Sequence, residues 1–341
     1  MIKLATVFSG IGAIEQALKK KGINHEIVFA CDNGNIELDI DPQEIRKEIQ
    51  GLSFYEQKKY IDNLYKATGK INYVEKSYLS NYNIKKENFF QDVRFIDGNF
   101  FNNEVDFFVG GSPCQSFSIN GKKQGLEDAR GTLFYDFARL VKEIQPKVFI
   151  FENVPHILKH DNGQTWEVIS NIFNELNYTW DFEILNAKGF GLPQNRRRVF
   201  VIGYRNDLNI DLVTFPQEDE LTATVTEYLD ENIDDKYYLP EKGFKYTTNP
   251  KNKKRVSINS EVSRCQAANQ QFNWCGDFRF ERPKDNHYYD DRIYIGEYQG
   301  ESGVVRKLTP MECLRLMGFS DNFKITVPDQ QIYRQSGNSP Y

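Results

Sequence analysis

The segment from Gly110 to Ser118, Gly-Gly-Ser-Pro-Cys-Gln-Ser-Phe-Ser, constrains the fold of this chain more than any other. It follows the short, β-branched and aromatic run 105–109, which predicts a buried strand ending in a tight glycine turn. In open α/β sheets ligands bind at the carboxyl ends of strands, where a thiol can serve as a nucleophile. An isolated cysteine is more often a small buried hydrophobe, but the polar, glycine-bearing residues up to Gly131 are typical of a loop. We therefore predict an α/β fold with Cys114 as a reactive group at a sheet edge.

Three further strand-like runs also end in polar or glycine residues. The first, near the N-terminus, leads into Gly10 and Gly12 and then a helix start, which is half of a dinucleotide fingerprint because Glu15 stands where a third glycine would be. The run 26–30 ends at Asp32, an acid that can accept hydrogen bonds from ribose hydroxyls. The run 147–151 ends at Glu152, and we expect it at the same sheet edge as the thiol.

Three consecutive arginines enter the apolar run 199–203, which is unusual for packing alone. Strand alternation predicts that Arg196 and Arg198 share one face, with Arg197 on the other. Two guanidinium groups can then point into the site together.

Ser-Pro-Cys-Gln after a strand, followed by Phe-Glu-Asn-Val at 151–154 and Gln-Asn-Arg-Arg-Arg at 194–198, resembles the bacterial and phage DNA cytosine-5 methyltransferases of the restriction-modification type. The resemblance implies an S-adenosylmethionine-dependent, Rossmann-like fold: a mixed, mostly parallel sheet with helices on both faces, plus a smaller, irregular target-recognition domain. It implies methyl transfer from S-adenosylmethionine to carbon 5 of a flipped cytosine, with S-adenosylhomocysteine as product and without a metal. Cys114 would add to carbon 6, Glu152 would bind N3, and Arg198 with Arg196 would hold the O2 edge.

The same resemblance implies where the cofactor binds. The glycine turn would approach its methionine part, Asp32 its ribose, and Asp92 with Val93 its adenine. The full set of cofactor residues implied is Phe8, Ser9, Gly10, Gly12, Asp32, Asn33, Asp92, Val93, Pro113, Leu133, Asn338 and Ser339.

The chain is expected to divide into a catalytic and cofactor-binding domain over 1–214, a target-recognition domain over 215–303, and a return to the catalytic domain over 304–341. Residues of about 36–86 are long for a crossover and carry helical apolar spacing, which predicts a helical insertion; a structural lid and an added DNA contact are both open. Thr309-Pro310 predicts a capped helix start and Gly318 its stop, as in the family's ninth motif. In the family a helix follows Gly-Asn-Ser, and we expect that final helix to be absent because the sequence ends at Tyr341.

The net charge of −5 conceals an uneven distribution. Residues 217–235 hold eight acids and no Lys or Arg, whereas residues 241–284 hold ten bases against four acids. Such a basic segment can track phosphates, and Arg, Asn and Gln read base edges, although a charge run is usually a solvated face. The residues expected to contact double-stranded DNA are Gln115, Ser118, Arg264, Gln266, Asn269 and Gln270.

Cysteine usage and hydropathy indicate in which cellular compartment the chain is expected. The five cysteines are scattered without paired spacing, which argues against a disulfide scaffold or a zinc site. No apolar run is long enough to cross a bilayer, and no signal peptide is recognisable. We expect a cytoplasmic, nucleoid-associated monomer, either paired with a separate restriction endonuclease or acting as an orphan methylase.

Three alternatives stay open at this point: methylation of RNA cytosine on the same core, an inert DNA-binding regulator, and a nicotinamide-dependent oxidoreductase. The basic segment favours duplex DNA over RNA. The catalytic set weakens the regulator, and the incomplete glycine turn weakens the oxidoreductase.

Overall fold

The structure is a computed structural model that describes residues 1–112, 132–210, 213–283 and 291–339. Two compact units account for the chain. Unit 1 comprises the described residues of 1–185 and 197–216, and unit 2 comprises those of 186–196 and 217–339. Each unit is described by itself.

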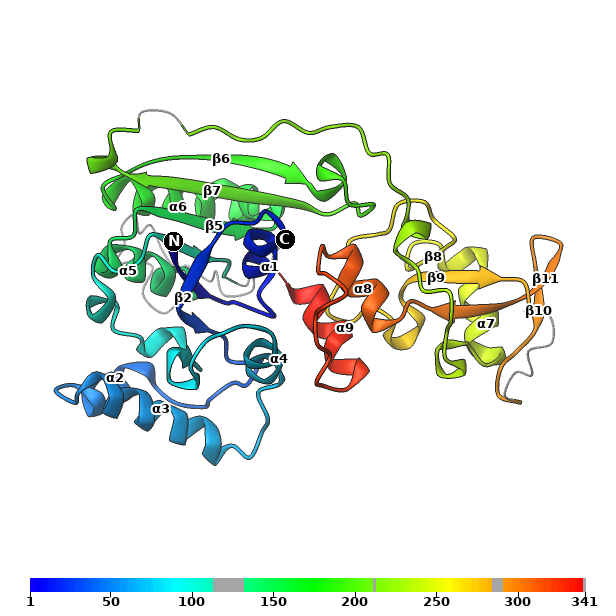
Figure 1. Cartoon of the computed structure of the whole chain (residues 1–341), viewed down its shortest axis with the longest axis horizontal. Coiled ribbons are helices and arrows are strands. Elements are labelled where there is room, and N and C mark those ends of the chain that lie inside the picture. Colours follow the sequence, from blue (N-terminus) through cyan, green and yellow to red (C-terminus); the bar gives the residue numbers. More distant parts are fainter. Residues whose placement is uncertain (113–131, 211–212, 284–290, 340–341) are drawn as a thin grey trace. The chain divides into compact units, whose positions relative to one another are not determined.

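A seven-stranded sheet with the order β3-β2-β1-β4-β5-β7-β6 organises unit 1 (Figure 1). β1, β2, β3, β4 and β5 pair in parallel, and β7 runs antiparallel to β5. The strands are β1 (Ile2–Val7), β2 (His25–Cys31), β3 (Phe89–Phe90), β4 (Phe107–Gly110), β5 (Val148–Asn153), β6 (Tyr178–Asn186) and β7 (Arg197–Arg205). The helices are α1 (Ala13–Lys20), α2 (Pro42–Ile49), α3 (Phe54–Ala67), α4 (Tyr73–Asn81), α5 (Leu133–Ile144) and α6 (Gln164–Glu175). The predicted mixed, mostly parallel sheet is confirmed.

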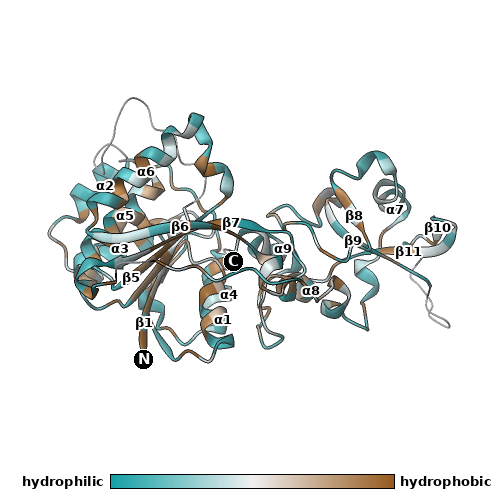
Figure 2. Ribbon diagram, turned by 90° about the horizontal axis from the view of Figure 1, so that it is seen from above, coloured by the Kyte–Doolittle hydropathy of each residue, from teal (hydrophilic) through white to brown (hydrophobic). Residues whose placement is uncertain are grey.

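Helices cover both faces of this sheet because its strands are apolar on both sides. On one face Phe108 and Phe149 pack against Phe137 of α5 and Phe173 of α6. On the other face α1 covers the sheet, with Leu18 packed among strand residues. Figure 2 shows the brown, hydrophobic strands between these helices. This arrangement exposes the carboxyl ends of the parallel strands, where the predicted site residues lie.

The helical insertion predicted for residues of about 36–86 is present as α2, α3 and α4. Ile45 and Ile49 of α2 and Ile61 and Tyr65 of α3 form a small core with Phe95. A capping box begins α3, in which Ser53 and Glu56 bond reciprocally. Figure 1 shows α2 and α3 as blue helices beside the sheet.

Unit 2 has a four-stranded sheet with the order β10-β11-β9-β8. Its strands are β8 (Val256–Ile258), β9 (Gly276–Glu281), β10 (Gly296–Tyr298) and β11 (Glu301–Lys307), and its helices are α7 (Glu241–Thr247), α8 (Pro310–Leu316) and α9 (Asp329–Asn338). As predicted, Thr309 caps α8, accepting a hydrogen bond from the Glu312 amide. Most of its other residues are irregular or in short 3-10 turns, as expected for this smaller domain.

The boundary expected at residue 303 differs from the division that the structure makes. β11 crosses that position and pairs antiparallel with both β10 and β9. Residues 304–339 accordingly lie in unit 2. The expectation that residues 304–341 return to the catalytic domain stays a prediction. The sequence pattern predicted the helix after Thr309 but not the strands of this sheet, and it carries no information on which strand pairs with which.

Candidate active site

Glu152 and Arg198 form an ion pair at the ends of two neighbouring strands. Arg198 Nε lies 2.7 Å from Glu152 Oε1, and the two side chains are 13% and 12% exposed. β5 brings the glutamate to this edge, and β7 pairs with it in a register that sets Asn153 opposite Val199, the neighbour of the arginine. The structure therefore brings together two of the predicted catalytic side chains.

The end of β4 lies against this pair. A Cβ added at Gly111 would lie 2.8 Å from both the backbone oxygen and Oε2 of Glu152, so only glycine permits this approach. Asn153 Nδ2 donates a hydrogen bond of 2.9 Å to the carbonyl of Ser112. The segment that carries the predicted thiol thus begins beside Glu152.

Four predicted residues fall outside the described part of the chain: Cys114, Pro113, Gln115 and Ser118. Their roles stay predictions. The preceding residue, Ser112, is buried, and its hydroxyl has no hydrogen-bond partner among the residues that the structure describes.

Arg196 has surroundings different from those of Arg198. It precedes β7, is 2% exposed, and donates to the carbonyls of Gln266 at 3.0 Å and Ser339 at 2.6 Å, all within unit 2. The alternation argument assumed a continuous strand through 196–198, but the strand begins at Arg197. These contacts hold Arg196 within unit 2. Its catalytic role beside Arg198 stays a prediction.

The glycine turn after β1 needs left-handed backbone. Gly10 has φ 53° and Gly12 φ 80°, a region that L side chains rarely adopt. Phe8 is also left-handed, with φ 55°. Ser9 is buried beneath the turn, where its hydroxyl is bonded to both the amide and the carbonyl of Cys31.

Asp32, at the end of β2, faces the glycine turn. Its Oδ2 accepts from the Gly10 amide at 2.9 Å and its Oδ1 from the Gly34 amide at 2.8 Å. Burial raises the pKa of this carboxyl above its ordinary value. Two donors leave room at a carboxylate that can accept about four hydrogen bonds, and the half-buried side chain can be reached from solvent. This acceptor capacity fits a ribose diol. Next to it, the side chain of Asn33 bonds to the backbone of Asn35 and Ile36.

Asp92, the predicted acceptor for the adenine amino group, is already bonded within the chain. It accepts from the Tyr65 hydroxyl at 2.9 Å and from the backbone and guanidinium of Arg94, including Nη2 at 2.7 Å. Its neighbour Val93 is buried. The role of Asp92 toward adenine stays a prediction, and its observed role is to hold the loop after β3.

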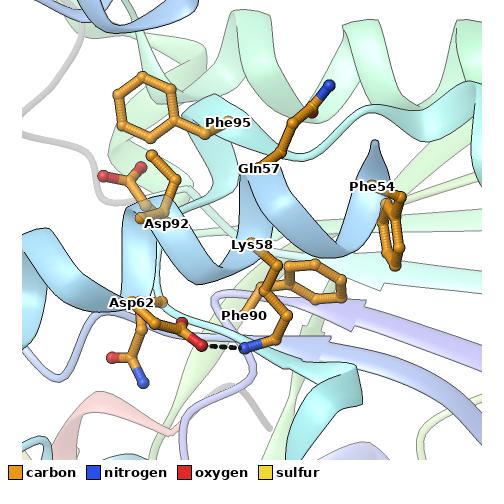
Figure 3. A pocket seen from close by; sticks show the side chains of 9 residues that line it. Phe54, Gln57, Lys58, Asp62, Phe90, Asp92 and Phe95 are labelled. Carbon is orange, nitrogen blue, oxygen red and sulfur yellow. Dashed lines mark hydrogen bonds and ion pairs between the residues drawn. The ribbon is translucent and has the colours of Figure 1, made fainter. Parts of the chain in front are cut away.

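A small pocket beside Asp92 was not foreseen from the sequence. It is lined by Phe54, Gln57, Lys58, Ile61 and Asp62 of α3 and by Phe90, Gln91, Asp92 and Phe95 (Figure 3). Lys58 pairs with Asp62 at 2.6 Å and lies over the ring of Phe90. The spacing of Phe54, Lys58 and Asp62 predicts that they share one face of α3, which lines one side of the pocket. Nothing in the sequence indicates that this face lies next to Asp92.

The remaining predicted cofactor residues lie in separate units. Leu133 is the first residue of α5 in unit 1 and is half-buried. Asn338, at the end of α9 in unit 2, is exposed, whereas Ser339 is buried.

The predicted base-reading residues divide by burial. Gln266 donates to the carbonyl of Cys313, and Gln270 donates to Gln266, to the Tyr333 carbonyl and to the Ser336 hydroxyl; both side chains are buried. In the structure the two amides join the 266–270 loop to α8 and α9. Their role toward bases stays a prediction. The composition of this stretch suggested amide side chains that read base edges. Composition alone does not show whether such side chains are exposed or are hydrogen-bonded inside the protein.

Asn269 is exposed and Arg264 half-buried, and their contact with DNA stays a prediction. The Arg264 guanidinium donates to the carbonyls of Lys253 and Lys254, which ties it to the basic turn 250–255. Lys251, the two other lysines of that turn and Arg255 are exposed.

Within residues 1–112, 132–210, 213–283 and 291–339, no group of three or more His, Cys, Asp or Glu side chains could hold a metal ion. Over the same ranges, no helix combines the length and the apolar character needed to cross a membrane.

Unit 1 thus brings the glycine turn, Asp32 and the Glu152–Arg198 pair to the carboxyl edge of a mostly parallel α/β sheet. The sequence matches the family described as C-5 cytosine-specific DNA methylase over residues 50–340. The chain is 37% identical over 247 residues to Type II methyltransferase M.HhaI of Haemophilus parahaemolyticus, covering 69% of this chain and 71% of that protein. It is 27% identical to orphan methyltransferase M.SPRI of Bacillus phage SPR, covering 99% of this chain and 94% of the phage protein.

Among solved structures, a DNMT2 variant of Spodoptera frugiperda has a similar fold, with a TM-score of 0.66 and 18% identity over 99% of this chain and 96% of that one. The chain belongs to the C-5 cytosine-specific DNA methylase family. This membership confirms the predicted family and enzyme class, a DNA (cytosine-5-)-methyltransferase, and the family and fold imply S-adenosylmethionine as methyl donor.

Proposed function

We propose that this chain is a sequence-specific methyltransferase that transfers a methyl group from S-adenosylmethionine to carbon 5 of a cytosine flipped out of duplex DNA. The observation that supports it best is the Glu152–Arg198 ion pair of 2.7 Å at adjacent strand ends. The segment leading to Cys114 begins beside this pair.

Carbon 5 of cytosine is too weak a nucleophile to be methylated directly. Addition of the Cys114 thiolate to carbon 6 forms a carbon–sulfur bond and moves electron density toward N3 and O2. Glu152 would donate a proton or hydrogen bond at N3, and Arg198 would hold O2, so the developing charge is stabilised. Carbon 5, now nucleophilic, would bond to the methyl group as the methyl–sulfur bond of the donor breaks and leaves S-adenosylhomocysteine. A base or water would then take the carbon 5 proton, and cleavage of the bond to the Cys114 sulfur would restore the ring and free the thiol.

The residues around the glycine turn would hold the methyl donor. Asp32 would accept from the ribose hydroxyls, with its Oδ2 already fixed by the Gly10 amide. When bound, S-adenosylmethionine supplies an electrophilic methyl group. We also propose that no metal takes part, since the sulfonium already activates that methyl.

The substrate would be double-stranded DNA, contacted by the basic turn 250–255 and by Arg264 and Asn269 of unit 2. Extruding the cytosine costs a few kcal/mol, which base and phosphate contacts must offset. We further propose that the chain acts as a monomer in the cytoplasm at the nucleoid. It would serve as the modification partner of a separate restriction endonuclease or as an orphan methylase, since relatives of both kinds are named.

The test is transfer of tritiated methyl from S-adenosylmethionine to mixed genomic DNA and, in parallel, to RNA. We expect label in DNA as 5-methylcytosine in one short sequence context, and no label with Cys114→Ser. Label in RNA alone would contradict the DNA substrate. Absence of label from both, with S-adenosylmethionine still bound, would favour a DNA-binding regulator.

A further inference from the structure

Three side chains of the insertion contact the three loops that surround the proposed cofactor site. These loops follow β1, β2 and β3 at the carboxyl edge of the sheet. The side chains are those of Tyr65 in α3, Asn72 before α4 and Tyr82 after it. Each contact lies within unit 1.

Tyr82 holds the glycine turn. Its hydroxyl lies 2.9 Å from the Ile11 carbonyl and 2.7 Å from the Gly12 carbonyl, and it accepts from Gln16 Nε2 at 3.2 Å. A Cβ at Gly12 would overlap the ring of Tyr82, so the ring fills the space beside the turn. The tyrosine therefore restrains both the position and the backbone of residues 11–12.

A second chain of hydrogen bonds connects the insertion to the residues beneath the glycine turn. Tyr78 of α4 donates to the buried carboxyl of Glu15, which also accepts from the Thr6 hydroxyl. Thr6 in turn is hydrogen-bonded to Ser9 at 2.7 Å. Glu15 takes the place of the third glycine of a dinucleotide fingerprint, and its partner comes from the insertion.

Asn72 joins the other two loops. Its Nδ2 donates to the carbonyl of Asp32 at 2.8 Å and to Gln91 Oε1 at 2.7 Å, while its Oδ1 accepts from the Glu75 amide. One buried amide thus connects the ribose acid, the strand before Asp92 and the start of α4. Tyr65 adds the bond to Asp92 itself, beside the pocket of Figure 3.

We propose that the insertion is a cofactor-positioning element, in which Tyr82 and Asn72 are positioning residues that set the affinity for S-adenosylmethionine, and that it is not a DNA-contacting element. This inference rests on the proposed function. It resolves the choice between a lid and a DNA contact in favour of a third role. The insertion preorganises the turn, the ribose acid and the Asp92 loop before the methyl donor binds.

The test compares Tyr82→Phe and Asn72→Ala with Tyr60→Phe. Tyr60 is a matched control because its hydroxyl bonds to Glu48 inside the insertion and to none of the three loops. Equilibrium binding of S-adenosylmethionine is measured by calorimetry without DNA, alongside thermal midpoints and the KM values for both substrates.

We expect Tyr82→Phe and Asn72→Ala to weaken S-adenosylmethionine binding about five- to tenfold, as the loss of one buried hydrogen bond implies. The KM for DNA should change less than about twofold, which is under 0.5 kcal/mol at RT of about 0.6 kcal/mol. Tyr60→Phe should leave cofactor binding as it is.

A rise in the KM for DNA with cofactor binding unchanged would overturn the proposal in favour of a DNA contact. Lower thermal midpoints with unchanged affinity would overturn it in favour of a purely structural insertion. If the unaltered chain binds no S-adenosylmethionine, the proposed function itself fails, and the inference fails with it.

Discussion

Each unit contains an arginine–glutamate pair, and the two pairs differ in how completely the protein encloses them. In unit 2, Arg306 and Glu312 are 1% and 0% exposed and bond bidentately at 2.8 and 3.0 Å. Glu312 also accepts from the amides of Thr309 and Asp230, and Arg306 also pairs with Glu281. In unit 1, Arg198 and Glu152 keep 13% and 12% exposure at the edge of the sheet.

This difference in exposure distinguishes an ion pair that stabilises the fold from one that could take part in catalysis. A buried pair whose hydrogen-bonding groups are satisfied holds elements together, and removing one partner leaves an uncompensated charge. A pair that solvent still reaches, beside the segment of the proposed nucleophile, can exchange contacts with a substrate. Substitutions in the two pairs should therefore affect different measurements.

The largest effect is expected for Glu152→Gln. Loss of the proton donor at N3 should lower kcat by about 10²- to 10⁴-fold, the usual contribution of a general acid. Because the pair lies at an edge, the thermal midpoint should change little. Methyl-transfer kinetics check this, with exposed Glu167→Gln of α6 as control. Full activity in the glutamine variant would remove Glu152 from the mechanism.

In unit 2, Glu312→Gln should destabilise the fold by about 3–5 kcal/mol, since it leaves the buried Arg306 without its bidentate partner. Denaturant unfolding measures this. Glu301→Gln serves as a matched control because it breaks the exposed Arg282–Glu301 pair, and it should have little effect. A loss below about 1 kcal/mol in the Glu312 variant would mean that the pair is not a structural one.

Unit 2 should also respond to pH through Asp277, on β9. Burial raises the pKa of this carboxyl from 3.8 to about 7. The folded state thus favours the protonated form, so the contribution of this group is fully present below about pH 4 and is lost as pH rises through about 7. Asp277→Asn should raise the thermal midpoint by a few degrees at pH 8 and by less at pH 5. An equal shift at both pH values, or the same shift in exposed Asp219→Asn, would contradict this account.

The smallest effect is expected for Thr309→Ala. It removes the hydroxyl that caps α8 and donates to Asp230, but leaves the Arg306–Glu312 pair intact. The cost should be about 1 kcal/mol, the typical value for an N-cap. Denaturant unfolding should rank it below Glu312→Gln; the reverse order would mean that the cap, not the ion pair, organises this region.

Local sequence signals predicted the elements of the sheet and the residues at its edge well. The glycines of the first turn need left-handed backbone, and Asp32 and Glu152 end apolar runs, so their positions follow from chain chemistry alone. The insertion was recognised by its length and helical spacing. Its partners were not, because Asn72 and Tyr82 reach loops that are distant in sequence.

What the sequence did not indicate has a common physical origin. Arg196, Gln266 and Gln270 were predicted to contact substrate because their side chains suit recognition, and their burial and bonds to backbone carbonyls were not foreseen. The pairing of β11 with β9 and β10 was not foreseen either, because strand pairing is a long-range property. Residue type predicts what a side chain can bond to, whereas tertiary packing decides which partner it receives.

The proposed mechanism requires that Cys114 adds to carbon 6 of a DNA cytosine while Glu152 and Arg198 hold the ring. Duplex DNA carrying 5-fluorocytosine tests it most directly, because fluorine cannot leave carbon 5 as a proton does and the carbon–sulfur bond then persists. With S-adenosylmethionine present, we expect a denaturation-resistant protein–DNA adduct whose mass includes one added methyl group and whose attachment maps to Cys114. No adduct with Cys114→Ser is expected. An adduct at another residue, or none where unmodified DNA is methylated, would contradict the mechanism.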